Sequence, residues 1–344
     1  MTFPPSPLRL LLSRQALQAW HSHIEQVLGA RPHELVILEE AVRQGRDDID
    51  VAFISRDITG LSTKHELAPE TRHCYDLMRR STGLRWVHIH SAGADRPIYV
   101  ELRERGVVVT TSSGANAEVV AQSALAGLLA LARRIPQLID AQRARRWMPL
   151  LGQHLPRDIT GQRALIVGWG PIGQRIGSLL SQLGLQVQVL RWRTDATPEP
   201  GITQLHVDQM AEALPMTDWL ILACPLTQQT RGLVDARVLA ALPTGACLIN
   251  VSRGEVVREA DVCAALQSGH LGGAMLDVFE HEPLPVDSPL WDMPQVIITP
   301  HSAGHSDGNE VRVAHMFLNN LRAWCAGDAL SHVVKSPNKR SVAC

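Results

Sequence analysis

The chain has 344 residues, of which 45% are apolar and 19% charged, so it has enough apolar sequence for about two packed domains. Its 33 lysines and arginines nearly balance 34 acidic residues, which argues against a nucleic-acid partner and against a polybasic membrane surface. No apolar run approaches the ~18 residues of a membrane-spanning helix, and the N-terminus lacks a signal-peptide pattern. We therefore expect a cytoplasmic protein whose six cysteines are reduced.

The first third of the chain alternates short apolar runs with helical segments. Strands are predicted over residues 35–38, 51–55, 86–89 and 107–110. Helices are predicted over residues 69–81 and 97–105, followed by a long helix rich in alanine and leucine over 116–134. Strand–helix alternation of this kind indicates a parallel sheet with helical crossovers.

The alternation restarts after a looser stretch at residues 145–161. Further strands are predicted over residues 164–167, 187–192, 219–223, 247–251, 274–278 and 296–299. Helices are predicted over residues 172–183, 235–241, 259–267 and 306–325. The expected fold class is therefore α/β, with two Rossmann-like or flavodoxin-like domains, each a parallel sheet with helices on both faces.

A glycine-rich turn joins the strand that ends at residue 167 to the next helix. Gly168, Gly170 and Gly173 form the pattern G-x-G-x-x-G in the strand–turn–helix context that this pattern requires. Gly168 permits the tight turn, Gly170 lets the backbone approach a pyrophosphate, and Gly173 lets the helix pack on the strand. Pro171 and Ile172 complete the loop at a helix N-terminus, which offers N–H groups to an anion. The sequence therefore predicts a dinucleotide site.

The end of the following strand distinguishes the two nicotinamide cofactors. NAD sites carry an acidic residue about 20 residues past the glycines, where it binds the ribose 2′-hydroxyl. Here that position holds Arg191, followed by Arg193 and Thr194. An arginine pairs with a 2′-phosphate through charge-assisted hydrogen bonds, so NADP(H) is predicted as the preferred cofactor. The alternative is that Arg191 is a solvated strand-end charge in an enzyme that uses NAD(H).

Six motifs follow one another along the chain in a characteristic order. They are the sequences at residues 91–95 (SAGAD), 168–173 (GWGPIG), 224–227 (CPLT) with Thr230-Arg231, 249–254 (INVSRG), 277–283 (DVFEHEP) and 299–304 (TPHSAG). From about residue 86 to residue 338, the chain resembles the D-isomer-specific 2-hydroxyacid dehydrogenase family, in particular its glyoxylate/hydroxypyruvate reductase-like branch.

The resemblance assigns the chemistry to Arg253, Glu282 and His301. These residue types suit the reduction of a 2-keto acid. A histidine can donate the proton that the carbonyl oxygen needs, and a carboxylate hydrogen-bonded to it stabilises the imidazolium. An arginine can hold the substrate carboxylate and polarise the keto oxygen. The related formate dehydrogenases carry glutamine in place of the acid, so Glu282 argues against that reaction.

The resemblance also implies residues that bind substrate and cofactor. Backbone N–H groups of Ala92, Gly93 and Ala94 are expected to hold the substrate carboxylate, and Ser55 and Arg56 are expected to face the same site. Asp277 is expected to contact the nicotinamide amide. The other residues expected in the cofactor groove are Asn116, Cys224, Pro225, Thr230, Val251, Ser252, His301, Ala303 and Gly304. No metal site is expected, because His301 and His305 lack further residues at ligand spacing.

The family architecture implies a dinucleotide-binding Rossmann domain, residues 116–304, inserted into a substrate domain made of residues 1–115 and 305–344. The expected activity is NADP(H)-dependent reduction of a short 2-keto acid to the D-2-hydroxy acid, in a homodimer. Two alternatives stay open at this point. One is a non-enzymatic protein of the same fold that senses dinucleotides, and the other is a dehydrogenase that oxidises phosphite.

Overall fold

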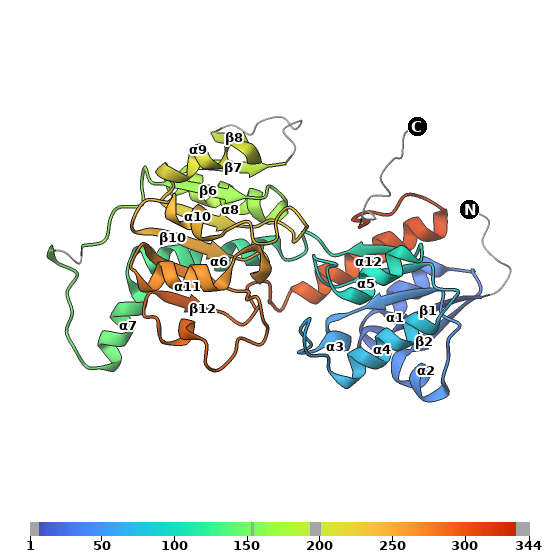
Figure 1. Cartoon of the computed structure of the whole chain (residues 1–344). Helices are drawn as coiled ribbons and strands as arrows, with labels where there is room; N and C mark the ends of the chain where they lie inside the picture. The colour runs from blue at the N-terminus through green and yellow to red at the C-terminus, as the bar shows by residue number, and fades with distance from the viewer. Residues whose placement is uncertain (1–6, 153–154, 193–200, 335–344) are drawn as a thin grey trace. The chain divides into compact units, whose positions relative to one another are not determined.

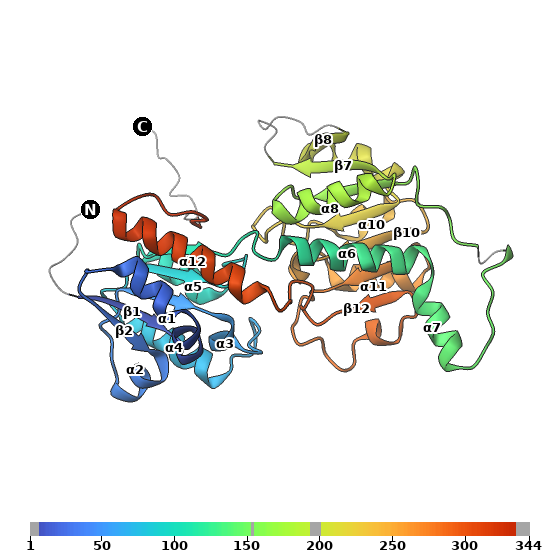
Figure 2. The same cartoon turned by 180° about the vertical axis from the view of Figure 1, so that it is seen from behind.

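The computed structural model describes residues 7–152, 155–192 and 201–334. The chain forms two compact units (Figures 1 and 2). Unit 1 is made of Met1–Ala115 and Ser306–Cys344, and unit 2 is made of Asn116–His305. The polypeptide therefore leaves unit 1, completes unit 2 and returns to unit 1 for its last helix. The domain boundary expected after residue 304 falls one residue before this division.

The sheet of unit 1 has five parallel strands in the order β2-β1-β3-β4-β5. The strands are β1 (Leu8–Leu12), β2 (His33–Ile37), β3 (Val51–Ile54), β4 (Trp86–Ile89) and β5 (Val108–Thr111). This order is that of flavodoxin-like folds, in which ligands bind at the carboxyl ends of the strands.

The sequence does not predict β1 or the helix α1 (Arg14–Leu28), because Arg9 and Arg14 interrupt the leucine-rich start of the chain. In the structure, the guanidinium of Arg9 forms an ion pair with Asp50 at 3.1 Å, so the strand tolerates this charge. Ser13 caps α1 by accepting a hydrogen bond from a backbone N–H of its first turn, which lets a helix begin at Arg14.

Helices cover both faces of this sheet. The side chains of Leu10 and Leu12 pack in a cluster with α1 and α12, whereas Leu11 packs in a cluster with α2, α4 and α5. This alternation follows from the two-residue period of a strand. The remaining helices of unit 1 are α2 (Leu38–Gln44), α3 (Arg56–Thr59), α4 (Pro69–Arg80), α5 (Pro97–Glu104) and α12 (Asn309–Ala326).

The sheet of unit 2 has seven parallel strands in the order β12-β11-β10-β9-β6-β7-β8. The strands are β6 (Arg163–Val167), β7 (Gln186–Arg191), β8 (Ile202–His206), β9 (Trp219–Leu222), β10 (Ala246–Asn250), β11 (Leu271–Leu276) and β12 (Val296–Ile298). The direction in which strands are added reverses between β6 and β9. The loops after these two strands therefore flank the switch point where such sheets bind ligands.

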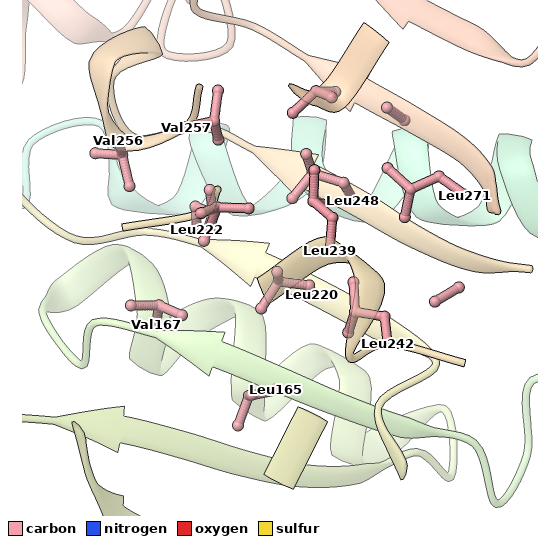
Figure 3. Packing of buried hydrophobic residues seen from close by; sticks show 14 of the residues in the cluster. Leu165, Val167, Leu220, Leu222, Leu239, Leu242, Leu248, Val256, Val257 and Leu271 are labelled. Carbon is pink, nitrogen blue, oxygen red and sulfur yellow. The ribbon is translucent and has the colours of Figure 1, made fainter. Parts of the chain in front are cut away.

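The core of unit 2 also lies on both faces of its sheet. Leu165 and Val167 pack in the cluster that includes residues of α10 and α11 (Figure 3). Ala164 and Ile166 pack on the other face with α6 and α8, which lie side by side in Figures 1 and 2. The α-helices of unit 2 are α6 (Ala117–Ala132), α7 (Ile135–Arg143), α8 (Pro171–Gln182), α9 (Met210–Ala213), α10 (Ala236–Ala240) and α11 (Glu259–Gln267). Its short 3-10 helices are η2 (Val207–Gln209), η3 (Leu214–Met216), η4 (Gly254–Val256) and η5 (Pro289–Asp292).

Strand β8 and helix α7 are the longer elements of unit 2 that the sequence analysis does not predict. Strand β8 lies at the sheet edge and lacks a buried apolar run, which is the signal that reveals the inner strands. Helix α7 buries only Ala141 completely. Within the described ranges, no single helix is long and apolar enough to cross a membrane, and α6 and α7 pass that test only together, across a bend of 67°.

Candidate functional site

Most of the predicted cofactor and catalytic residues lie at one edge of the unit 2 sheet. Gly168 follows β6, Cys224 follows β9, Arg253 follows β10, Asp277 follows β11 and His301 follows β12. Because all seven strands are parallel, their carboxyl ends meet at the same edge. The sheet therefore brings together motifs that are more than a hundred residues apart in the chain.

The glycine-rich loop is sterically specified. Gly168 has a φ of +101°, and a Cβ built there would lie 2.7 Å from the Cα of Cys224. A Cβ at Gly173 would overlap the carbonyl oxygen of Gly168. A Cβ at Gly170 would meet nothing within 4 Å, so the backbone is open on that side. With Pro171 and the adjacent Ile172 opening α8, this loop fits a dinucleotide phosphate at a helix N-terminus.

Arg191 is the last residue of β7, beside this loop. The Gly168 N–H donates to the carbonyl of Leu190 at 3.1 Å, which places the strand end against the glycines. The Nη1 of Arg191 donates to Oε1 of Gln204 on β8 at 3.0 Å. Within the described part of the chain, the Arg191 guanidinium forms no ion pair with a carboxylate, so it can still receive an anion. Arg193 and Thr194, also predicted to bind the cofactor, lie outside the described residues.

His301 and Glu282 form a hydrogen-bonded pair. Nδ1 of His301 lies 2.8 Å from Oε2 of Glu282, and Oε1 of Glu282 accepts from the Phe279 N–H at 3.2 Å. The side chain of Glu282 is 14% exposed and that of His301 is 46% exposed. An ionised carboxylate can only accept, so Nδ1 donates and the neutral imidazole carries its lone pair on Nε2. The pair thus presents a histidine suited to proton transfer.

Glu282 stays ionised despite its burial. Burial by itself would raise the pKa of Glu282, but the hydrogen bond from His301, the positive charge of His301, the Phe279 N–H and the positive charge of Arg253 outweigh it. The net result is a pKa below the usual glutamate value. The same contacts show that Arg253 is near enough to act electrostatically on this carboxylate.

Arg253 is positioned by residues that the sequence analysis did not single out. Oδ1 of the fully buried Asn250 accepts from the N–H and the hydroxyl of Ser252 at 3.1 and 2.7 Å, and its Nδ2 donates to the Arg253 carbonyl at 3.2 Å. A Cβ at Gly254 would overlap the backbone carbonyl of Phe279. Both residues belong to the motif at 249–254, and the motif is the only sequence signal for their role.

Asp277 anchors the loop that carries His301. Its Oδ1 accepts from the Thr299 hydroxyl at 2.6 Å and from the N–H groups of Ser302 and Ala303 at 2.8 and 2.9 Å. Its backbone carbonyl accepts from the His301 N–H at 2.8 Å. Asp277 is therefore a positioning residue, and its contact with the nicotinamide amide stays a prediction. Thr299 is a further residue that the sequence analysis missed.

Three other predicted cofactor residues lie in well-defined surroundings. The Thr230 hydroxyl donates to the Pro225 carbonyl at 2.7 Å and so closes the loop after β9. Cys224 is buried, which raises the pKa of its thiol to about 12 and leaves it unreactive. Val251 is also buried, in the hydrophobic cluster that includes residues of α6 and α8.

Asn116 and Gly304 meet at the start of α6. A Cβ at Gly304 would overlap Nδ2 of Asn116. The Oδ1 of Asn116 is buried and has no hydrogen-bond partner among the described residues. A buried unpaired acceptor is costly unless a ligand donor reaches it, so this residue fits the side of a cofactor site.

In unit 1, the predicted substrate residues follow two adjacent strands. Ala92, Gly93 and Ala94 come after β4, where the Ser91 hydroxyl donates to the Gly93 carbonyl at 2.8 Å and tightens the turn. Ser55 and Arg56 come after β3. Ser55 is buried against Ser13, with 3.2 Å between the two hydroxyl oxygens, whereas Arg56 is half-buried at the start of α3.

The loop that holds Ala92–Ala94 is braced from its far end. Nζ of Lys64 lies 2.5 Å from Oδ2 of Asp95. The guanidinium of Arg96 donates to the Ser62 carbonyl at 2.5 Å and to the Tyr75 hydroxyl at 3.0 Å.

Among the described residues, no group of three or more His, Cys, Asp or Glu side chains is arranged to hold a metal ion.

Comparisons with known proteins agree with the motifs. The model of the family described as "D-isomer specific 2-hydroxyacid dehydrogenase, NAD binding domain" matches residues 125–303. The chain is 32% identical over 260 residues to a glyoxylate reductase of Korarchaeum cryptofilum, covering 73% of this chain and 76% of that protein. It is 32% identical over 256 residues to an (S)-sulfolactate dehydrogenase of Chromohalobacter salexigens, covering 73% of this chain and 81% of that protein.

A solved structure is similar over nearly the whole chain. It is a D-isomer-specific 2-hydroxyacid dehydrogenase of Xanthobacter autotrophicus Py2 in complex with NADPH and MES. The TM-score is 0.74 and the sequence identity 30%, with 96% of this chain and 98% of that chain covered.

Proposed function

The chain belongs to the D-isomer-specific 2-hydroxyacid dehydrogenase family, and we propose that it reduces a short 2-keto acid of the glyoxylate or hydroxypyruvate type to the D-2-hydroxy acid with NADP(H). The observation that carries this proposal is the His301–Glu282 pair, 2.8 Å apart and within electrostatic reach of Arg253. The reaction needs a proton donor beside a positive charge, and the pair and Arg253 provide both.

Each residue has a role in this scheme. When bound, the reduced nicotinamide supplies a hydride to the keto carbon. His301 donates the proton from Nε2 to the keto oxygen, so keto acid, reduced nicotinamide and proton become hydroxy acid and oxidised nicotinamide. Glu282 holds the imidazole by Nδ1 and stabilises its protonated form. Arg253 balances the negative charge of the substrate, and the N–H groups of Ala92–Ala94 bind its carboxylate.

The cofactor is proposed to be held by the residues at the edge of the unit 2 sheet. Gly168, Gly170 and Gly173 would receive its pyrophosphate, and the unpaired Oδ1 of Asn116 would accept from it. Arg191 supports a preference for NADP(H), because a guanidinium pairs with a 2′-phosphate and cannot accept from ribose hydroxyls. The solved relative of Xanthobacter autotrophicus contains NADPH, and NAD(H) is the alternative.

The identity of the acid depends on the pocket. Relatives at equal identity, 32%, are named for glyoxylate and for sulfolactate, so similarity alone does not choose between substrates. Small differences in a substrate pocket change specificity by only ~1–3 kcal/mol each.

A homodimer built through unit 2 is part of the proposal. Apolar side chains are exposed on α7 and on the extended segment after it, where a second chain would cover them. They are Ile135, Ile139, Trp147, Leu151 and Leu155.

The test measures oxidation of NADPH and of NADH with glyoxylate, hydroxypyruvate, pyruvate and a bulkier keto acid, for the wild type and for Arg191→Ala. We expect turnover with NADPH preferred and with that preference lost in the variant. Turnover that favours NADH would retain the reductase and contradict the role of Arg191. Tight dinucleotide binding without turnover of any of these acids would contradict the proposed function.

A further inference from the structure

Unit 1 contains a small cavity that none of the roles above explains. It lies at the carboxyl ends of its strands, between the first turns of α1 and α12. Its volume is about 50 Å³, roughly three to five times the ~10–15 Å³ that one water needs on this measure. It therefore suits a small group and is too small for a large ligand. Its lining includes Trp20, Phe53, Arg56, His90, Asn309 and Val313.

The guanidinium of Arg56 is the distinctive feature of this cavity. It is half-buried, yet it forms no hydrogen bond or ion pair with any side chain or carbonyl in the described part of the chain. Two other arginines of unit 1, by contrast, form ion pairs: Arg9 with Asp50 at 3.1 Å and Arg79 with Glu101 at 2.9 Å. Partial burial of a cation without a hydrogen-bond acceptor costs free energy, and a bound anion would recover it. The Arg56 guanidinium is therefore suited to bind an anion.

The charges around Arg56 also favour the binding of an anion. Burial and the positive charge of Arg96 both lower the pKa of Arg56, which places two guanidinium groups in the same neighbourhood. Asp57 and Glu310 also line the cavity, but both are exposed, and neither forms an ion pair with Arg56. Arg56 is therefore a half-buried positive charge of the cavity lining, whereas the two acidic lining residues are exposed to solvent.

The position of Arg56 relates it to the substrate. Strands β3 and β4 are neighbours, and the His90 N–H donates to the Ile54 carbonyl at 2.9 Å where they end. Arg56 follows β3, and the Ala92–Ala94 turn proposed to hold the reacting carboxylate follows β4. Neighbouring strands are about 4.8 Å apart, which is the length scale of a three- or four-carbon acid.

We propose that this cavity receives a second anionic group of the substrate, so that Arg56 is a specificity-determining residue and the preferred substrates are short 2-keto acids carrying a further carboxylate or sulfonate. The inference rests on the proposed keto acid reductase activity and, for its preferred substrate, replaces the glyoxylate or hydroxypyruvate type by keto acids with a second anionic group. The competing assignment is that Arg56 binds the reacting carboxylate itself, which every 2-keto acid has.

The test compares oxaloacetate, which has the second carboxylate, with pyruvate and with 2-oxovalerate, a neutral acid of similar length. The enzymes are the wild type, Arg56→Gln, Arg56→Lys and Arg80→Gln, which removes an exposed arginine of α4 outside the cavity. For the wild type, we expect kcat/KM for oxaloacetate to exceed that for 2-oxovalerate at least tenfold. Arg56→Gln should remove this preference mainly by raising KM for oxaloacetate, Arg56→Lys should restore part of it, and Arg80→Gln should keep it.

A binding measurement separates a folding defect from a lost site. Malonate should raise the melting temperature of the wild type more than acetate does, and this difference should disappear in Arg56→Gln. An equal loss of activity on all three acids in Arg56→Gln would overturn the proposal in favour of the reacting carboxylate, while leaving the reductase intact. A wild type that reduces glyoxylate but shows no preference for oxaloacetate would also overturn it. A wild type that reduces no keto acid at all would overturn the proposed function as well.

Discussion

At the scale of single residues, the hydrogen bond between Glu282 and His301 fixes which ring nitrogen of His301 carries the proton in the neutral imidazole. Glu282 is mostly buried, and the contacts that keep it ionised are the contacts that orient His301. Because the folded-state pKa of Glu282 is lowered, its contribution to stability is complete above the usual glutamate range and is lost as the pH falls below it. The catalytic pair is therefore expected to persist across neutral pH.

Replacing Glu282 by Gln should reduce activity without unfolding the protein. The amide can still accept the hydrogen bond from Nδ1, but it provides no negative charge to stabilise the imidazolium. We expect kcat/KM for reduction to fall at least about tenfold, and the loss of rate at rising pH to begin at lower pH. The measurement is a pH–rate profile. Glu280→Gln removes an exposed carboxylate of the same loop, and an equal loss in that variant would contradict the special role of Glu282.

His88 carries a different pH dependence, unrelated to catalysis. It is fully buried, with Nδ1 2.8 Å from the Thr110 hydroxyl oxygen and Nε2 3.1 Å from that of Ser112. Burial, with a smaller effect of His332, lowers the pKa of His88 from 6.5 to about 3. The unfolded chain therefore binds this proton between about pH 6.5 and pH 3 and the folded chain does not, so stability falls as the pH falls through that window.

Titration of His88 alone should change the free energy of unfolding by at most about 1.4 kcal/mol per pH unit. Denaturant unfolding at pH 7 and pH 5 should show a larger loss for the wild type than for His88→Gln, which cannot titrate. Equal losses in the two proteins would show that His88 is protonated in the folded state.

At the scale of elements, loop backbones in close contact build the site. The loop after β10 touches the loop after β11 at Gly254, where a Cβ would overlap the Phe279 carbonyl. That contact holds Arg253 and Glu282 in one neighbourhood. The glycine loop after β6 touches the loop after β9 in the same way, at Gly168 and Cys224.

Gly254→Ala and Gly170→Ala should therefore differ in their effect on stability. Gly254→Ala must displace backbone, so we expect a loss of roughly 1–3 kcal/mol of stability and much lower activity. At Gly170, φ is −83° and nothing lies within 4 Å of a Cβ, so stability should change by less than about 0.5 kcal/mol while dinucleotide binding weakens. Thermal unfolding and cofactor titration measure the two effects. Equal destabilisation by both changes would contradict this account of the loops.

The elements that carry motifs are those that the sequence predicts best. Strands such as β6 and β10 are apolar runs buried on both faces, bounded by glycine or polar turns, and both signals are local. Strand β8 is half-buried at an edge, and β1 contains Arg9, whose charge is balanced only by residues about 40 positions away. Asn250 and Thr299 belong to sequence motifs, but their roles depend on hydrogen bonds that form only in the fold, so the motifs do not reveal their partners.

On the scale of the whole molecule, the chain crosses between the units twice, after Ala115 and before Ser306. Within unit 2, Gly304 packs against Asn116, next to these crossings. Within unit 1, Nε of Arg312 donates to the Ala115 carbonyl at 2.5 Å. Of the residues proposed to line the cofactor site, Asn116 therefore lies next to the first crossing and Gly304 lies close to the second.

The proposed homodimer can be tested at the exposed apolar side chains that follow α7. Trp147 is 97% exposed, and Leu151 and Leu155 follow it at 67% and 61%, an apolar series that a monomer would leave in water. Stable interfaces bury at least about 1,000 Å² and place aromatic side chains at their centre. Trp147→Glu should therefore put a charge into the interface and convert the dimer to a monomer, seen by light scattering at micromolar concentration. Val286→Glu changes a side chain of unit 2 that is 98% exposed but distant in sequence, and it should remain dimeric. A monomeric wild type, or a Trp147→Glu variant that stays dimeric, would show that this segment has another role.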